Sequence, residues 1–291
     1  MSNSIDLFLG QLVLGLVNGS FYAMLSLGLA VIFGMLGVVN FAHGALYTAG
    51  AFTAWLLSRY AGLGMLPALL VVPVAVGALA AVFERYSLKP LYKIPHIYVL
   101  LATFGFALII QGLLRELYGT TGLVYPVPPQ LRGGFDLGTL YLPYYRIFVI
   151  FFSATICCGV WFFIEKTSHG MYIRAAAENP SMLRTFGVRV NGIMTLTFAG
   201  GAGLAAIAGV VGAPIYTVSS NMGHDLLILI FAVVVIGGLG SIKGPVITAY
   251  IVGISEGLAK AYVPQLAEVV VFILMVLILL FRPAGLFGTR A

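Results

Sequence analysis

Residues Glu165 to Asn191 read EKTSHGMYIRAAAENPSMLRTFGVRVN, a polar and cationic stretch that separates two strongly apolar parts of the chain. The apolar runs on either side are long enough to cross a bilayer, which takes about 20 helical residues. The stretch therefore lies outside the hydrocarbon, and the chain crosses the membrane on both sides of it. A structured cationic loop on the cytoplasmic face of a membrane protein indicates a docking site for a partner. This pattern favours a machine with a separate energy source over a self-contained carrier.

The composition also indicates a membrane protein. Hydrophobic residues make up 61% of the 291 residues and charged residues 8%, whereas a soluble domain carries roughly 25% charged residues. The 36 glycines favour a helical bundle, because small residues let transmembrane helices approach closely. The continuous apolar runs differ from the short alternating strands of a barrel. The net charge of +6 does not indicate a nucleic-acid partner, since the basic residues stand at the ends of apolar runs.

The predicted fold is all-α, a polytopic membrane bundle of about eight or nine spanning segments that forms one transmembrane domain over residues 1–291. The predicted segments are 8–36, 41–57, 64–84, 97–117, 145–165, 192–215, 225–240, 244–262 and 264–282. The first is long and rich in glycine, which predicts either a tilted helix or a helix broken into a short piece and a full span. The seventh is short and runs into GGLGSIKG (Gly237–Gly244), so it either crosses the membrane or re-enters.

The charges in the loops orient the bundle. With the N-terminus outside, the cytoplasmic segments hold ten of the 15 Lys and Arg residues, and the outer segments hold five. The positive-inside rule favours this orientation, with the C-terminus in the cytoplasm. The segment of about 166–191 then faces the cytoplasm. The loop of about 118–145 faces outside, either as a plain connection or as a platform for an external partner. A re-entrant seventh segment would change the orientation of the last two helices.

Helix-end signals define a short helix inside the polar stretch. Asn179 suits an N-cap, Pro180 suits the first helical position, and Gly187 suits the left-handed residue after a helix end. The sequence therefore predicts a helix over 180–186. Its apolar stripe, Met182, Leu183 and Phe186, has Arg184 and Arg189 beside it. Such a helix fits a groove on a soluble partner, or alternatively lies on the lipid surface.

Polar and glycine residues within the spans are the candidates for a translocation pathway. The polar candidates are Asn18, Tyr22, Asn40, His43, Thr103 and Gln111. Hydrogen bonding between helices is the alternative for each of them, since a polar group in hydrocarbon needs a partner. Gly237, Gly238 and Gly240 interrupt the seventh segment and would either line a path or allow close packing.

Ionisable residues within the spans are few. Proton-coupled carriers usually bury ionisable relays in the membrane, and only Glu256 and Glu268 are mid-helix candidates here. Both could instead be charges near the outer surface, and Glu256 precedes Lys260 by four residues, a favourable helical pair spacing. The four histidines share no metal-ligand spacing, so no metal site is predicted.

Four stretches resemble one family of membrane proteins. RAAAENPSMLRTFGV, within the polar stretch, resembles the cytoplasmic coupling segment of permease subunits of ATP-binding-cassette importers. VNFAHGALYTAGAF (Val39–Phe52), GGLGSIKGPVITAYIVG (Gly237–Gly253) and FRPAGLFG (Phe281–Gly288) resemble the branched-chain amino acid permeases among them. The stretches occur in the family's order over nearly the whole chain. The sequence is most similar to the shorter of the family's two permease types.

The resemblance implies a bacterial-type inner membrane protein that forms half of a translocation pathway. It implies three kinds of protein partner besides membrane lipid: a homologous second permease, two cytoplasmic ATPases, and an extracytoplasmic protein that delivers the substrate. It also implies a set of ATPase-coupling residues. These are Arg174, Glu178, Asn179, Pro180, Met182, Leu183, Arg184, Phe186 and Gly187.

The sequence and the resemblance together give expectations for the energy source and the cargo. The chain has no G-x-x-x-x-G-K-[ST] phosphate loop, so the expectation is a non-enzymatic subunit that binds no cofactor itself, with ATP on the partner subunits. The family suggests branched-chain amino acids as the cargo. Urea, amides or small organic acids are the alternative cargo, and an ion-coupled carrier is the alternative class. The pore is either a heterodimer or a homodimer.

Overall fold

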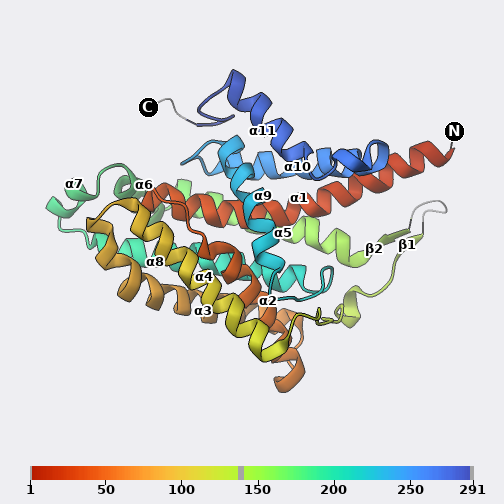
Figure 1. Ribbon diagram of the computed structural model, residues 1–291, viewed down its shortest axis with the longest axis horizontal. Helices are drawn as coiled ribbons and strands as arrows, with labels where there is room; N and C mark the ends of the chain where they lie inside the picture. The colour runs from red at the N-terminus through yellow and green to blue at the C-terminus, as the bar shows by residue number, and fades with distance from the viewer. Residues whose placement is uncertain (1, 137–140, 289–291) are drawn as a thin grey trace. The chain divides into compact units, whose positions relative to one another are not determined.

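The computed structural model describes residues 2–136 and 141–288, and most of them are helical (Figure 1). The predicted all-α membrane fold is therefore confirmed. The α-helices are α1 (Ser2–Leu36), α2 (Ala42–Ala61), α3 (Met65–Phe83), α4 (His96–Tyr118), α5 (Tyr144–Lys166), α6 (Ser168–Glu178), α7 (Pro180–Thr185), α8 (Val190–Gly212), α9 (Met222–Gly237), α10 (Lys243–Tyr262) and α11 (Val270–Phe281). The shorter elements are the π-helical turn η1 (Glu84–Leu88), the 3-10 turns η2 (Lys89–Lys93), η3 (Pro129–Leu131) and η4 (Pro264–Leu266), and the strands β1 (Gly134–Asp136) and β2 (Tyr141–Pro143).

Within the described residues, five helical segments are long and apolar enough to cross a membrane. They are Leu7–Leu36, Met65–Lys93, Ile97–Tyr118, Tyr144–Lys166 and Val190–Gly212. α1 is one unbroken helix of 35 residues, so the predicted alternative of a break is wrong. α9, with 16 residues, and α11, with 12, are apolar but short. The choice between crossing and re-entry for α9 stays a prediction.

The chain divides into two compact units, and α1, α5 and α9 each contribute residues to both of them. The first unit comprises the described parts of 1–27, 127–159 and 229–291. Here α1 packs on α10 through glycines: a Cβ atom added to Gly15 would lie 2.6 Å from the Gly253 carbonyl oxygen. Ser20 Oγ lies 3.4 Å from Tyr250 Oη, and Ser26 Oγ donates to the Pro245 carbonyl at 3.4 Å. Small and hydroxyl residues thus hold this helix pair together, as expected where lipid removes any hydrophobic driving force between helices.

The second unit comprises residues 28–126 and 160–228. In it, α2, α3 and α8 pack against one another, α4 packs on α2, and α6 and α7 contact α8 (Figure 1). The α2–α8 contact is close enough that a Cβ atom on Gly50 would lie 2.6 Å from the Cα atom of Ala206. This unit carries the predicted docking segment and most of the predicted polar pathway residues.

The loop predicted over 118–145 contains some regular structure. β1 and β2 pair antiparallel, with Gly134 opposite Pro143 and Asp136 opposite Tyr141. Residues 137–140 of the predicted loop lie outside the described part of the chain. In the second unit, Leu123 exchanges two backbone hydrogen bonds of 2.9 Å with Val218. Tyr125 is buried, and burial raises the pKa of its phenol, so this side chain stays neutral at physiological pH.

Candidate coupling segment and transport cavity

The short helix α7 has the capping signals that the sequence predicts. The Asn179 side-chain oxygen accepts from the Met182 N–H at 3.0 Å, and Pro180 occupies the first turn. Gly187 follows the helix with φ +76°, a conformation that favours glycine. The predicted helix over 180–186 is confirmed, although it ends at Thr185 and Phe186 is its C-cap. Capping at both ends gives this segment a defined shape.

The residues of the predicted apolar stripe differ in burial. Leu183 packs against a buried cluster of Met35, Ala176 and Val190, which come from α1, α6 and α8. Met182 is 57% exposed and Phe186 is 71% exposed. Leu183 therefore anchors α7 to the body of the second unit, and Met182 and Phe186 form an exposed apolar knob.

The sequence interpretation did not include α6, which precedes the short helix. The Thr167 hydroxyl caps α6 by accepting from the Gly170 N–H at 3.2 Å. Arg174, a predicted coupling residue, donates to the carbonyl oxygen of Ile164 and lies 4.0 Å from the Glu165 carboxylate. Arg174 thus joins α6 to the C-terminal end of α5, where a cation is favourable. The signal that could have found α6 is Thr167, a hydroxyl residue just before the helix.

The other predicted coupling residues lie at the junctions of these helices. Glu178 is exposed at the end of α6. The Arg184 guanidinium donates to the Asn191 side-chain oxygen at 3.4 Å, which links α7 to the start of α8. The structure therefore brings the predicted coupling residues together on α6, α7 and the turn that follows. Their role in coupling stays a prediction.

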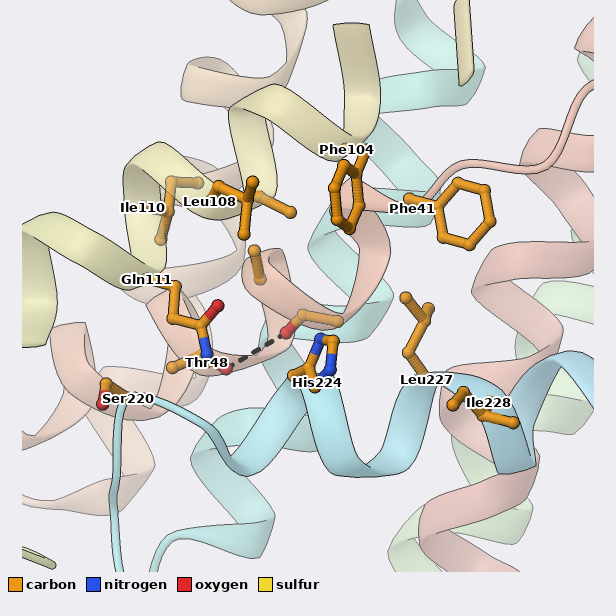
Figure 2. Close-up of a pocket in the computed structure, with 13 residues that line it drawn as sticks. Phe41, Thr48, Phe104, Leu108, Ile110, Gln111, Ser220, His224, Leu227 and Ile228 are labelled. Atoms are coloured by element: carbon orange, nitrogen blue, oxygen red, sulfur yellow. Dashed lines mark hydrogen bonds between the residues drawn. The ribbon is translucent and has the colours of Figure 1, made fainter. Parts of the chain in front are cut away.

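An open cavity of about 140 Å³ lies between α2, α4 and the first turns of α9 (Figure 2). Its lining is mostly apolar, with a few polar side chains. In Figure 2, Thr48, Gln111 and Ser220 lie on the left with Leu108 and Ile110 above them, His224 lies near the centre, and Phe41, Leu227 and Ile228 lie on the right. Among the predicted pathway residues, Gln111 lines this cavity, and its side-chain N–H donates to the Asn221 side-chain oxygen at 2.6 Å.

The wall of the cavity is a very close crossing of α2 and α9. A Cβ atom on Gly44 would overlap the carbonyl oxygen of Gly223, and a Cβ atom on Gly223 would overlap that of Gly44. The Thr48 hydroxyl accepts from the Gly223 N–H at 3.0 Å and donates to the Gly44 carbonyl at 3.1 Å, the bond drawn in Figure 2. Only residues without a side chain allow this crossing.

Three further predicted pathway residues shape the start of α2 beside the cavity. The Asn40 side-chain oxygen accepts from the Ala42 N–H at 3.0 Å, and Thr103 of α4 accepts from the Phe41 N–H at 3.3 Å. His43 is buried, with 1% of its surface exposed. Hydrogen bonding that positions α2 is the role that the geometry gives to Asn40 and Thr103.

The sequence interpretation missed Thr48, Ser220 and His224 as cavity residues. His224 was considered only as a metal ligand, and in the structure it stands in the first turn of α9, next to Gly223. A polar residue beside glycine at the start of a short apolar helix is the signal that could have found it. Thr48 carried no such signal, because its role depends on the approach of a helix 175 residues away in sequence.

Two of the predicted pathway residues belong to the first unit. Asn18 is partly buried in α1. The Tyr22 hydroxyl donates to Glu256 of α10 at 2.7 Å, and Lys260 donates to the other oxygen of the same carboxylate at 2.5 Å. The predicted Glu256–Lys260 helical pair is therefore confirmed. Glu268 is exposed and precedes α11, so the mid-helix alternative for it is wrong, because η4 delays the start of the last helix.

The glycine-rich break after α9 is a tight turn. α9 ends at Gly237, and Gly238 and Gly240 have φ values of +105° and +85°. The FRPAGLFG stretch folds back on it: the Leu286 N–H donates to the Ile236 carbonyl at 2.8 Å. These contacts give the glycines a packing role, and their place in the translocation pathway stays a prediction.

These features define the class of protein: a multi-pass helical membrane protein with an open cavity and a short capped helix that presents an apolar knob. The chain belongs to the family described as the permease component of the branched-chain amino acid transport system, which matches residues 11–279. The resemblance seen in the sequence is therefore confirmed.

Several curated proteins are similar to the chain. The high-affinity branched-chain amino acid transport system permease protein BraD from Pseudomonas aeruginosa is 30% identical, over 97% of this chain and 96% of its own length. LivH from Escherichia coli K12 is 29% identical, over 99% and 98%. LivM from the same organism is 27% identical, over 91% of this chain but 67% of its own length. The chain thus matches the shorter permease type in length. No solved structure gives a significant match.

Proposed function

We propose that the chain is the permease subunit of an ATP-driven importer, in which it forms half of the translocation pathway for branched-chain amino acids. The family match over residues 11–279 supports transport as the function. The observation that carries the proposal of a separate energy source is the capped helix α7, on which Met182 and the C-cap residue Phe186 are exposed and available to a partner. An amphipathic helix with exposed apolar anchors is a recurrent element of groove binding.

The anchoring of α7 supports a way to pass movement from the partner to the membrane helices. Leu183 packs on a cluster that joins Met35 of α1, Ala176 of α6 and Val190 of α8. A push on the exposed side of α7 therefore acts on side chains of three helices. α8 in turn packs on α2, whose residues Gly44 and Thr48 line the cavity. This chain of contacts lies entirely within the second unit.

The lining of the cavity supports an aliphatic cargo. Eight of its lining residues have purely apolar side chains: Phe41, Ala45, Phe104, Ala107, Leu108, Ile110, Leu227 and Ile228. Such a wall suits the side chain of leucine, isoleucine or valine, because burying apolar surface away from water is favourable by about 25 cal/mol per Å². Urea or an amide would leave polar groups facing these residues, at a free-energy cost.

The remaining parts of the proposal concern the partners and the membrane. A homologous second permease is supported by the similarity of this chain to both LivH and LivM. Two cytoplasmic ATPases, which bind ATP, and an extracytoplasmic binding protein complete the proposed assembly. The proposed location is a bacterial-type inner membrane, with the N-terminus outside and α6 and α7 in the cytoplasm, as the loop charges favour.

Affinity purification from native membranes in mild detergent tests the proposal, with identification of each protein that accompanies the chain. Recovery of one or two P-loop ATPases with a second permease supports it. Recovery of the chain alone, together with substrate uptake after its reconstitution without partners, overturns it in favour of a self-contained carrier.

A further inference from the structure

A basic groove of about 460 Å³ lies in the second unit, where the turns after α3 meet the start of α8. Four cationic side chains line it: Arg85, Lys89, Arg184 and Arg189. No carboxylate is among its lining residues. The two ion pairs found among the described residues, Glu165–Arg174 and Glu256–Lys260, lie elsewhere. The groove therefore concentrates positive charge without an acidic partner in its wall.

The carboxylate nearest in sequence, Glu84, lies behind the groove wall and is held by hydroxyl donors, one of them from the groove-lining residue Thr195. Glu84, in the π-helical turn, is 1% exposed. It accepts from the Tyr92 hydroxyl at 3.0 Å and from the Thr195 hydroxyl at 2.5 Å. Both of its oxygens thus have hydroxyl donors, and the buried carboxylate is not presented to a ligand in the groove.

An exposed apolar stripe on the last turns of α3 and on η1 leads to the same groove. Leu79 is 46% exposed, Val82 55% and Tyr86 72%. Leu79 and Val82 are spaced i and i+3, which places them on one face of α3. Tyr86 and Arg85 lie in the π-helical turn that follows, and Lys89 begins the next 3-10 turn. The stripe belongs to Met65–Lys93, an apolar segment long enough to cross a membrane, whose most apolar window is only 28% buried. Apolar surface of a membrane span and four cations therefore adjoin one another.

We propose that the groove binds the phosphate group of an anionic phospholipid, with the acyl chains along the stripe formed by Leu79, Val82 and Tyr86. Arginine is suited to phosphate because its planar guanidinium can donate two parallel hydrogen bonds. An acidic segment of a soluble protein would match the cations but would leave the apolar stripe without a role. Because Arg184 belongs to α7 and Lys89 to the turn after α3, the bound headgroup braces the docking helix against the membrane span.

The test measures lipid retention by the purified full-length chain. Native mass spectrometry compares phosphatidylglycerol with phosphatidylcholine of the same acyl chains, for wild type and for the double variant Arg85→Gln with Lys89→Gln. Each cation near an anionic headgroup strengthens binding roughly fivefold, so the variant should hold phosphatidylglycerol about 25-fold more weakly. The matched control is Arg59→Gln with Arg115→Gln, which removes two exposed cations from the last turns of α2 and α4. It should change the retention of phosphatidylglycerol by less than about twofold.

Three results would overturn the proposal. One is equal retention of phosphatidylglycerol by the wild type and the double variant. Another is binding of inorganic phosphate as tight as that of the lipid, which would assign the groove to a soluble anion. The third is loss of co-purifying ATPases from the variant with lipid retention unchanged, which would assign it to a protein partner. If the variant does not fold, photo-crosslinking of wild type to a photoactivatable phosphatidylglycerol decides: adducts within 79–92 and 184–195 support the proposal, and adducts confined to other segments refute it.

Discussion

Phe186→Glu should abolish coupled transport while leaving the chain folded and inserted. Phe186 is 71% exposed, so the free chain loses little by the change. Full burial of a phenylalanine contributes about 1.5–3 kcal/mol, and the exposed share that a partner groove would cover is therefore worth about 1–2 kcal/mol. Placing an unpaired carboxylate in that groove adds at least the cost of burying an unpaired neutral polar group, about 1–3 kcal/mol. A combined loss of at least about 3 kcal/mol corresponds to a loss of docking affinity of roughly a hundredfold or more.

The assay uses proteoliposomes that contain the chain with its co-purified partners, and records ATP hydrolysis and amino acid uptake in the same preparation. We expect uptake to fall to background, and any hydrolysis that remains no longer to depend on the substrate. Phe186→Leu is the matched control, because it keeps an apolar side chain and should retain most of the uptake. Normal coupled uptake in Phe186→Glu would refute the docking role of α7.

Three other variants test the anchoring of α7 and the cavity. Leu183→Ala should destabilise the folded chain by about 1–3 kcal/mol, because Leu183 packs on a buried cluster; an unchanged thermal midpoint in detergent would contradict this. Gly44→Ala should lower uptake at least roughly fivefold, because the added methyl overlaps the Gly223 carbonyl and overpacking costs about 1–3 kcal/mol. Gly105→Ala, with open space around it, should transport normally, and equal rates for the two variants would count against the cavity. Gln111→Leu should change the selectivity among aliphatic amino acids and leave the amount of folded protein nearly unchanged. Uptake measured with competing amino acids tests this, and unchanged preferences would place Gln111 off the pathway.

The helices that sequence predicted best are those with local signals. Nine apolar segments correspond to α1 through α5 and α8 through α11, because length and hydropathy are properties of the segment alone. α7 was predicted almost to the residue because Asn179, Pro180 and Gly187 each act on the adjacent backbone. α6 was missed because its few apolar residues, packed on α8, look like part of a polar loop.

The cavity could be predicted only in part. Gln111 is a polar residue in an apolar run and was visible as such. Thr48 and His224 come together only because Gly44 and Gly223 allow two helices, far apart in sequence, to touch. Likewise, Leu183 and Phe186 look alike in the sequence, and only the packing of α7 on α1, α6 and α8 shows that one is an anchor and the other is exposed.

Uptake of radiolabelled leucine into proteoliposomes tests the central claim most directly. The chain is reconstituted alone and together with its co-purified ATPases, second permease and binding protein, in each case with and without ATP. The account predicts uptake only when all partners and ATP are present. Uptake by the chain alone, driven by an ion gradient, would contradict it.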